Sequence, residues 1–332
     1  MSLLLVLLMG CSNRLTTEPC QDRFSSPGAY TCPFEGFANR EYDLVLPRGY
    51  DGSQPVPVVV AIHGGGGSRV AQARTSCPGG KVDEPECLHK LADKEGFAVV
   101  YPNGTGGNGL GANIRTWNAG GGGGDWRCAS GKACENGVDE LAYFNGLLDD
   151  LEERVNVDTD RIYATGLSNG GAMSHRLACE LSDRIAAVAP VGGAMQLTTS
   201  DTCEPSRPIP VLQVHGTEDP CWKYAGGVSD CPIGQNGLKH VAVSRTMNEW
   251  AEILECEGDP VVTDLADKQD DGTHTRRHVW QGCDADLELL EIVGGGHAWP
   301  NGHPYLAERT IGTVPRDWGS EEIWAFLSRQ SL

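Results

Sequence analysis

The chain has 332 residues, of which 39% are hydrophobic and 21% charged, values that are typical of a globular protein and argue against disorder. Its formal net charge of -19 at pH 7 argues against nucleic-acid binding, because contact with phosphates requires clustered lysine and arginine. A chain of this length can bury one large core, and we expect a single main domain over residues 39–332.

The first segment, residues 1–11, reads MSLLLVLLMGC and is predicted to be an export signal. A short apolar run that ends in a small residue and a cysteine is typical of such signals and is too short to span a membrane. The last four residues resemble a bacterial lipoprotein cleavage box, so we expect Cys11 to carry a lipid. The protein would then be extracellular, or a periplasmic or outer-surface lipoprotein whose membrane contact is limited to that anchor. Residues 12–38 are polar and are predicted to form an N-terminal extension.

The cysteines support export independently. Setting Cys11 aside leaves twelve of the thirteen, an even number that is typical of oxidised, exported proteins. Disulfides are favoured over zinc because the chain has no pair spaced as C-x-x-C, and we expect no metal site. Proximity in the sequence suggests six pairs: Cys20 with Cys32, Cys77 with Cys87, Cys128 with Cys134, Cys179 with Cys203, Cys221 with Cys231, and Cys256 with Cys283.

Apolar runs that end in glycine or a turn recur along the chain and are typical of buried strands. An alternating stretch at 40–50 is predicted to be an edge strand. The buried runs lie at 56–67, 96–104, 161–166, 186–193, 209–216 and 287–296, and helical spacing occurs at 138–155, 240–254 and 319–330. This alternation predicts an α/β fold, with a mainly parallel sheet covered by helices on both faces. In such sheets we expect chemistry in the loops that follow the strands.

The glycine-dense stretch at 115–134 lies between two of these elements. It is either a flexible surface loop or part of the rim of a cleft, with Trp117 and Trp126 as apolar contacts. The sequence leaves both interpretations open.

A serine lies between two glycines in Gly166-Leu167-Ser168-Asn169-Gly170, directly after an apolar run and before a helical stretch. A G-x-S-x-G match in this context predicts a sharp strand-to-helix turn that exposes the serine hydroxyl above the sheet. Side chains at the two glycine positions would collide with neighbouring elements in so tight a bend. Ser168 is therefore the predicted nucleophile.

A serine hydroxyl needs a base to take its proton and an acid to orient that base. His297 follows the last strongly apolar run on a glycine-rich loop, and Asp219 follows the preceding run, in the chain order Ser, Asp, His. His215 as the base and Glu218 as the acid are the alternatives. His175, on the helix after Ser168, is expected to be solvated or to pack that helix.

Attack by Ser168 would place negative charge on a carbonyl oxygen, which backbone N–H groups stabilise. Asn169, the residue after the nucleophile, is expected to supply one N–H group, and Gly65 in the stretch HGGGG (63–67) the second. That stretch could instead be a mobile loop. His63 is expected to be structural.

Five stretches carry a resemblance to a known family: AIHGGGG, RIYATGLSNGGAMSHRLACEL, VDELAYFNGLLDDL, LQVHGTEDP and GGGHAWPNG. They resemble the secreted polyhydroxybutyrate depolymerase and feruloyl esterase group of α/β-hydrolases, which also includes acetylxylan esterases. The resemblance covers about residues 40–330 and implies an α/β-hydrolase fold with Ser168, Asp219 and His297 as a serine esterase triad. It also implies bridges like Cys179–Cys203 and Cys256–Cys283. The five glycines at 120–124 and the extra cysteines within 77–87 and 221–231 depart from the group, so the resemblance carries over the chemistry but not the shape of the pocket.

The sequence thus predicts an exported serine carboxylester hydrolase, acting without a cofactor on feruloyl or acetyl esters of plant cell-wall polysaccharide. Trp299 and Trp117 are expected either to form an aromatic wall for the substrate or simply to pack. The alternative is a polyester depolymerase, acting on polyhydroxybutyrate or an aromatic polyester, which usually carries a polymer-binding module that is not visible here. A more distant alternative is a non-catalytic surface lipoprotein.

Overall fold

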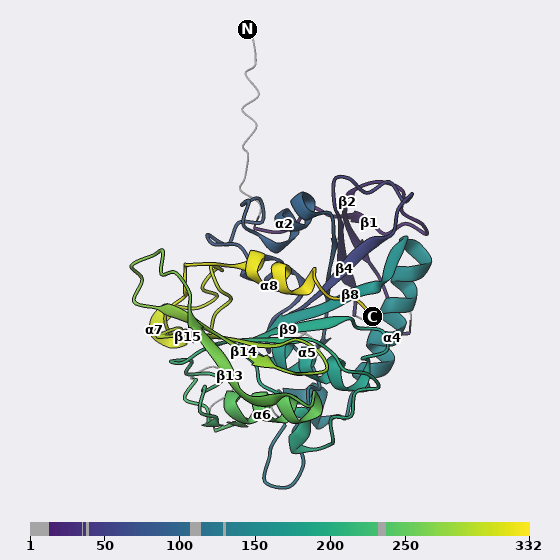
Figure 1. Ribbon diagram of the computed structural model, residues 1–332. Helices are drawn as coiled ribbons and strands as arrows, with labels where there is room; N and C mark the ends of the chain where they lie inside the picture. Colours follow the sequence, from purple (N-terminus) through teal and green to yellow (C-terminus); the bar gives the residue numbers. More distant parts are fainter. Residues whose placement is uncertain (1–12, 35, 38–39, 107–113, 129–130, 232–236) are drawn as a thin grey trace.

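The computed structural model describes residues 13–34, 36–37, 40–106, 114–128, 131–231 and 237–332, and its core is one twisted sheet of eleven strands (Figure 1). The predicted signal at 1–11 and the predicted lipid site Cys11 lie outside the described residues. Neighbouring strands at the centre of the sheet are parallel, in the order β5 (Ala98–Pro102), β4 (Val56–Ile62), β8 (Val157–Leu167), β9 (Ala187–Val191), β10 (Val211–Gly216) and β15 (Leu287–Val293).

Shorter or more polar strands extend the sheet at both sides. On one side β3 (Tyr42–Leu46) pairs antiparallel with β5, and β2 (Gly28–Cys32) and β1 (Glu18–Pro19) follow it. On the other side β14 (His274–Gln281) and β13 (Glu257–Asp264) form an antiparallel hairpin beside β15. Two small two-stranded sheets lie in loops: β6 (Thr105–Gly106) with β7 (Arg115–Thr116), and β11 (Gly227–Val228) with β12 (Lys239–His240).

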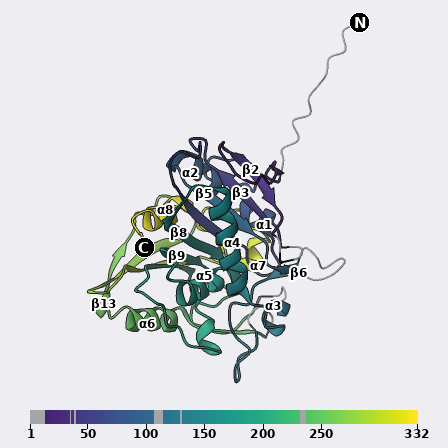
Figure 2. The same cartoon turned by 90° about the vertical axis from the view of Figure 1, so that its right-hand side faces the viewer.

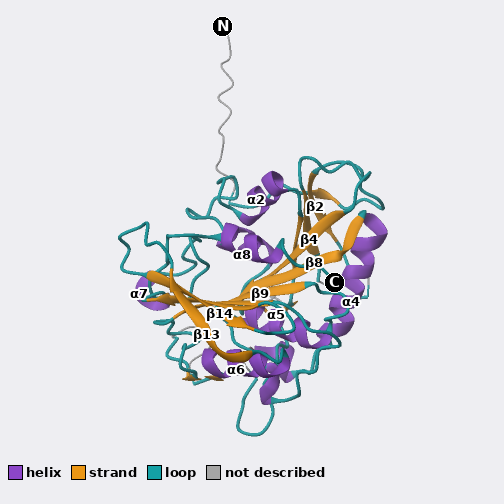
Figure 3. Cartoon of the chain, in the orientation of Figure 1, coloured by secondary structure: helices purple, strands orange, loops and turns teal. Residues whose placement is uncertain are grey.

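Helices cover both faces of the sheet, as the alternation of runs predicts (Figure 3). The turned view in Figure 2 shows α2 and α8 above β8 and β9, with α5 and α6 below them. One face packs against α4 (Glu140–Arg154), α5 (Asn169–Glu180) and α6 (Val243–Ile253), and the other against α1 (Arg69–Thr75), α2 (Leu88–Glu95) and α8 (Ser320–Leu327). The short helices α3 (Gly131–Glu135) and α7 (Glu308–Ile311) lie in loops. No helix in the described part of the chain is long and apolar enough to cross a bilayer.

Strand β4 shows why these runs form buried strands. Successive side chains of a strand point to opposite faces, so Val58 and Val60 join one core cluster while Val59 and Ala61 join the other. A strand with helices on both faces therefore needs apolar residues at every position, and β-branched valine suits the extended backbone.

The N-terminal side of the sheet differs from the sequence prediction. Residues 40–50 do not form an edge strand, because β3 lies between β5 and β2. The sheet therefore extends into residues 12–38, which the sequence predicts as a polar extension. Strand β2 is a five-residue segment, GAYTC, that pairs with β3 from Gly28 opposite Leu46 to Cys32 opposite Tyr42. So short a strand, with glycine at its start, carries no periodic signal of its own.

Six disulfides fasten the described part of the chain, in the pairs that proximity in the sequence suggests. The Cys256–Cys283 bridge joins the residue before β13 to a residue after β14 and so closes the base of that hairpin. The other five are Cys20–Cys32, Cys77–Cys87, Cys128–Cys134, Cys179–Cys203 and Cys221–Cys231.

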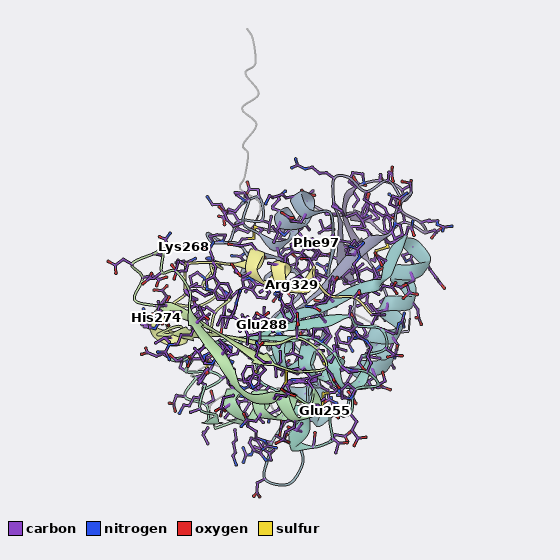
Figure 4. All side chains as sticks on the ribbon, viewed as in Figure 1. Phe97, Glu255, Lys268, His274, Glu288 and Arg329 are labelled. Atoms are coloured by element: carbon purple, nitrogen blue, oxygen red, sulfur yellow. A yellow bond between two sulfur atoms is a disulfide. The ribbon has the colours of Figure 1, made fainter. Side chains whose placement is uncertain are left out.

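The C-terminal helix is held to the sheet by apolar and charged contacts. Trp324 of α8 stacks on Phe97 with ring centroids 3.9 Å apart. Just beyond the helix, Arg329 donates to Glu288 of β15 at 2.8 Å, and Figure 4 shows Phe97, Arg329 and Glu288 around α8. These contacts secure the end of the chain on the face opposite α5.

Candidate active site

Ser168 lies at the turn between the last residue of β8 and the first residue of α5. Its backbone angles, φ 61° and ψ -120°, are strained for a residue with a side chain. Backbone hydrogen bonds hold the turn: Ser168 N–H donates to Val191 O at 2.8 Å, and Ala172 N–H donates to Ser168 O at 2.9 Å. A strained serine at a helix N-terminus matches the turn that the sequence predicts.

The glycines two residues before and after Ser168 lie against β4. A Cβ atom at Gly166 would lie 2.5 Å from the carbonyl oxygen of Ile62, and one at Gly170 would lie 2.2 Å from that oxygen. Both distances are far below van der Waals contact, and the obstacle is backbone that cannot rotate away. Glycine at these two positions lets β8 and α5 approach β4 closely enough to form the turn.

We expect Gly170→Ala to lower the free energy of unfolding by about 3 kcal/mol or more, because the added methyl group would force α5 away from β4. Urea denaturation followed by circular dichroism measures this change. Gly49→Ala is the matched control, since a Cβ atom at Gly49 meets nothing within 4 Å, and its effect should stay within about 0.5 kcal/mol. Equal stability of the two variants would contradict this account of the turn.

Asp219 and His297 approach each other from the loops after β10 and β15. Nδ1 of His297 lies 2.5 Å from Oδ2 of Asp219, and both side chains are buried. The other carboxylate oxygen, Oδ1, accepts N–H groups from Cys221 and Trp222 at 2.7 Å each. The carboxylate therefore has a fixed orientation, and Nε2 of His297 is left for a further partner.

The charge state of Asp219 follows from the same contacts. Burial raises the pKa of this carboxyl, but the charge of His297 and hydrogen bonds from His215 and His297 outweigh burial, and the pKa falls to about 2. Asp219 is therefore ionised at any pH near neutrality. An ionised carboxylate on Nδ1 favours the tautomer in which His297 Nε2 can accept a proton.

Ser168 and His297 line the same cavity, which has a volume of about 310 Å³. The glycine-rich segment 64–67 forms another part of its wall, and a Cβ atom at Gly64 would lie 3.3 Å from the Cβ atom of Ser168. The structure thus brings together the predicted nucleophile, base and oxyanion loop. The remaining lining residues are His63, Ala71, Gln72, Thr75, Leu167, Cys221, Cys231, Tyr305 and Leu306.

Buried hydrogen bonds hold the oxyanion loop in place. Nδ1 of His63 lies 2.8 Å from Gly64 O. Nε2 of the same ring accepts the N–H of Gly104 at 2.9 Å. Burial lowers the pKa of His63 to about 3, so its ring stays neutral, and both ring nitrogens are engaged by backbone groups. Trp117 Nε1–H donates to His63 O at 2.9 Å. The loop is therefore braced rather than free.

The side chain of Asn169 contributes to the same support. Its Oδ1 accepts Trp117 N–H at 2.7 Å, and its Nδ2 donates to Trp117 O at 3.1 Å. These two bonds tie the first residue of α5 to the start of the glycine-dense stretch 115–134. That part of the stretch is consequently packed core, with Trp117 and Ala119 fully buried.

The prediction that Trp117 and Trp299 form an aromatic wall for the substrate is wrong. Both side chains are 0% exposed and belong to the hydrophobic core. Trp299 packs on the face that carries α8 and donates to Ser320 Oγ at 3.1 Å. A large apolar side chain next to a functional loop can turn inward as readily as outward, and both tryptophans do so. Tyr305 and Leu306 line the cavity instead, and no strand or motif in the sequence marks them.

The structure also separates the alternatives for the acid and the base. Glu218 is exposed, whereas the carboxylate that contacts His297 is that of Asp219. His215 is buried behind that carboxylate, with Nε2 2.7 Å from Trp222 O. His175 is fully buried and is bonded to Gln213, so it is not solvated.

No family model matches the chain. It is 26% identical over 267 residues to "Feruloyl esterase B" of Piromyces equi, covering 79% of this chain and 43% of that protein. It is 31% identical over 245 residues to the "Bifunctional acetylxylan esterase/xylanase XynS20E" of Neocallimastix patriciarum, covering 73% of this chain and 28% of that protein. The chain therefore spans less than half the length of either relative.

Among solved structures, the chain resembles the acetyl xylan esterase from Aspergillus awamori with a TM-score of 0.55 and 14% identity. The match covers 87% of this chain and 94% of that one. At this identity the likeness shows a shared fold.

Proposed function

We propose, from the premise that this chain has the α/β-hydrolase fold and is a distant homologue of feruloyl and acetylxylan esterases, that it hydrolyses carboxylic esters through an acyl-enzyme. The observation that carries the proposal is the buried Asp219–His297 pair, 2.5 Å apart, at a cavity that Ser168 also lines. These three groups are those needed to activate a serine hydroxyl for attack.

In the proposed reaction, Oγ of Ser168 attacks the ester carbonyl while Nε2 of His297 takes its proton. The N–H groups of Asn169 and Gly65 stabilise the resulting oxyanion. The carbonyl re-forms as the alcohol leaves with the proton from His297, and the acyl group stays on Ser168. Water then attacks the acyl-enzyme with His297 as base, the bond to Ser168 breaks as Oγ takes the proton from His297, and the acid leaves. Asp219 stays ionised throughout and holds the imidazole in place.

The cavity favours an aromatic acyl group. Its volume of about 310 Å³ is that of a pocket for a small organic molecule and is larger than an acetyl group needs. Its walls include Leu167, Leu306, the ring of Tyr305 and the Cys221–Cys231 bridge. Feruloyl esters of plant cell-wall polysaccharide are therefore the first proposed substrates, and acetylated xylan the second.

Export belongs to the same proposal. The residues that the structure describes hold six disulfides, a number that is typical of proteins that fold in an oxidising compartment. A polymeric plant substrate would also be met outside the cell. Lipidation of Cys11 remains a prediction from the sequence.

A comparison of substrates tests the proposal. We expect the highest kcat/KM on methyl ferulate, a lower rate on acetylated xylan, and little release from a polyhydroxybutyrate suspension. Leu306→Trp, which narrows the cavity, should lower kcat/KM on methyl ferulate by about 10-fold to 200-fold and on p-nitrophenyl acetate by much less. A preference for polyhydroxybutyrate would favour the polyester depolymerase, and equal losses on both soluble esters would show that the cavity does not hold the acyl group.

A further inference from the structure

A line of buried polar side chains runs from Asp219 into the core between the sheet and two helices. His215 and Gln213 lie on β10, His175 on α5 and Trp250 on α6, and each of the four is at most 1% exposed. Trp250 Nε1 lies 3.0 Å from His175 Nδ1, and His175 Nε2 lies 2.7 Å from Gln213 Oε1. Gln213 Nε2 lies 3.3 Å from His215 Nδ1.

Trp250, at the far end, sets which group donates and which accepts in each hydrogen bond of this line. An indole nitrogen only donates, so Nδ1 of His175 must accept and its proton must lie on Nε2. His175 then donates to Gln213 Oε1, which turns the amide nitrogen of Gln213 toward His215. Burial lowers the pKa of His175 to about 4, so its ring is neutral near pH 7 and the direction is kept.

At the near end the line reaches the proposed active site. Because Nδ1 of His215 accepts from Gln213, the proton of His215 lies on Nε2. That nitrogen is 2.7 Å from Trp222 O and 3.4 Å from Asp219 Oδ2. His215 thus secures the loop whose N–H groups hold Asp219 and also faces the carboxylate itself.

We propose that Trp250, His175 and Gln213 are positioning residues that keep the proton of His215 on Nε2, and thereby hold the Asp219 carboxylate against His297. The proposal rests on the proposed esterase function. None of these side chains touches substrate, so their effect reaches the chemistry only through Asp219.

Exchanging donors and acceptors along the line would disturb the Asp219 carboxylate. Without the indole donor, His175 can move its proton to Nδ1, and the amide of Gln213 can then flip, at the cost of the bond that its Nε2 donates to Val214 O, 3.1 Å long. His215 would move its proton to Nδ1 and turn a lone pair on Nε2 toward two oxygens, those of Trp222 and Asp219. Repulsion there would displace the carboxylate, and a misplacement of about 1 Å costs on the order of 100-fold in rate.

The first experiment is Trp250→Phe, which removes the indole donor but keeps an aromatic ring. We expect kcat on p-nitrophenyl acetate to fall by about 10-fold to 100-fold with KM nearly unchanged. Imidazole ¹⁵N NMR should show His215 gaining the Nδ1–H tautomer. The matched control is Trp318→Phe, which removes a buried indole hydrogen bond to Thr275 Oγ1, 2.9 Å long, at a different site. It should leave both readouts unchanged.

The second experiment breaks the line in its middle with Gln213→Met, which is close in volume to glutamine and removes the amide. We expect a similar fall in kcat, and adding Trp250→Phe should then cause no further loss, because the two changes act through one path. Additive losses, or wild-type tautomers of His215 in both single variants, would overturn the proposal.

The tautomer measurement also separates this proposal from the esterase proposal. If the native protein and Ser168→Ala hydrolyse esters at equal rates, the esterase proposal fails, while ¹⁵N NMR still reports whether Trp250 sets the proton of His215. If the native protein is active and the tautomer does not respond in either variant, the positioning role alone fails.

Discussion

Ser168→Ala is expected to lower kcat on p-nitrophenyl acetate by about 10⁶-fold, because alanine has no oxygen to form the acyl-enzyme. The expectation follows from the position of Ser168 on a strained turn, in the cavity that His297 also lines. Rates under saturating substrate measure the effect, and circular dichroism shows whether the fold is kept.

Ser174→Ala serves as the matched control for this change. Ser174 lies on α5, and its Oγ donates to Gly170 O at 2.9 Å. Its substitution therefore removes a hydroxyl group from this helix but leaves Ser168 in place. Its activity should remain close to that of the native protein. Equal rates for the native protein and Ser168→Ala would instead favour a non-catalytic surface lipoprotein.

Asp219→Asn is expected to lower kcat by about 10⁴-fold, by analogy with the loss when a serine-enzyme triad aspartate becomes asparagine. The N–H groups of Cys221 and Trp222 would select the amide oxygen, since they can only donate. The amide NH₂ would then face Nδ1 of His297, which would have to accept and carry its proton on Nε2. In that tautomer His297 cannot take a proton from Ser168.

Glu218→Gln is the control for the aspartate substitution. Glu218 precedes Asp219 in the sequence but is exposed, so its neutralisation should change kcat by less than about 2-fold. A large loss in Glu218→Gln together with a small loss in Asp219→Asn would reverse the assignment of the acid.

Sequence reasoning succeeds where one local rule dominates. The turn at Ser168 could be predicted because an apolar strand, a G-x-S-x-G match and a helical stretch follow one another directly, and the distances at Gly166 and Gly170 give the steric reason. The central strands could be predicted because strands buried on both faces, such as β4, require continuous apolar runs.

Elements whose residues carry no periodic apolar signal were missed. Strand β13 is exposed at nearly every position, so its composition resembles that of a loop. Pairing with β14 and the bridge at Cys256 hold it in place. Strand β2 is short and adjoins a polar segment. In both cases pairing with a neighbour, which is non-local, overrides local composition.

The orientation of single side chains could not be predicted either. Nothing in the sequence distinguishes a tryptophan that lines a cavity from one that braces a loop, and Trp117 braces the segment that carries His63. The line behind Asp219 is hidden for the same reason. Its members come from β10, α5 and α6, and only the packing of these elements brings them into contact.

The bridge between Cys221 and Cys231 has a practical consequence for anyone preparing this protein. Both of its cysteines line the cavity, and the N–H of Cys221 is one of the two donors that orient Asp219. Protein expressed in a reducing bacterial cytoplasm would lack this bridge. Its cavity wall and the Asp219 carboxylate would then be less constrained. Secretion into an oxidising compartment, followed by a thiol titration, is the suitable production route before any rate is measured.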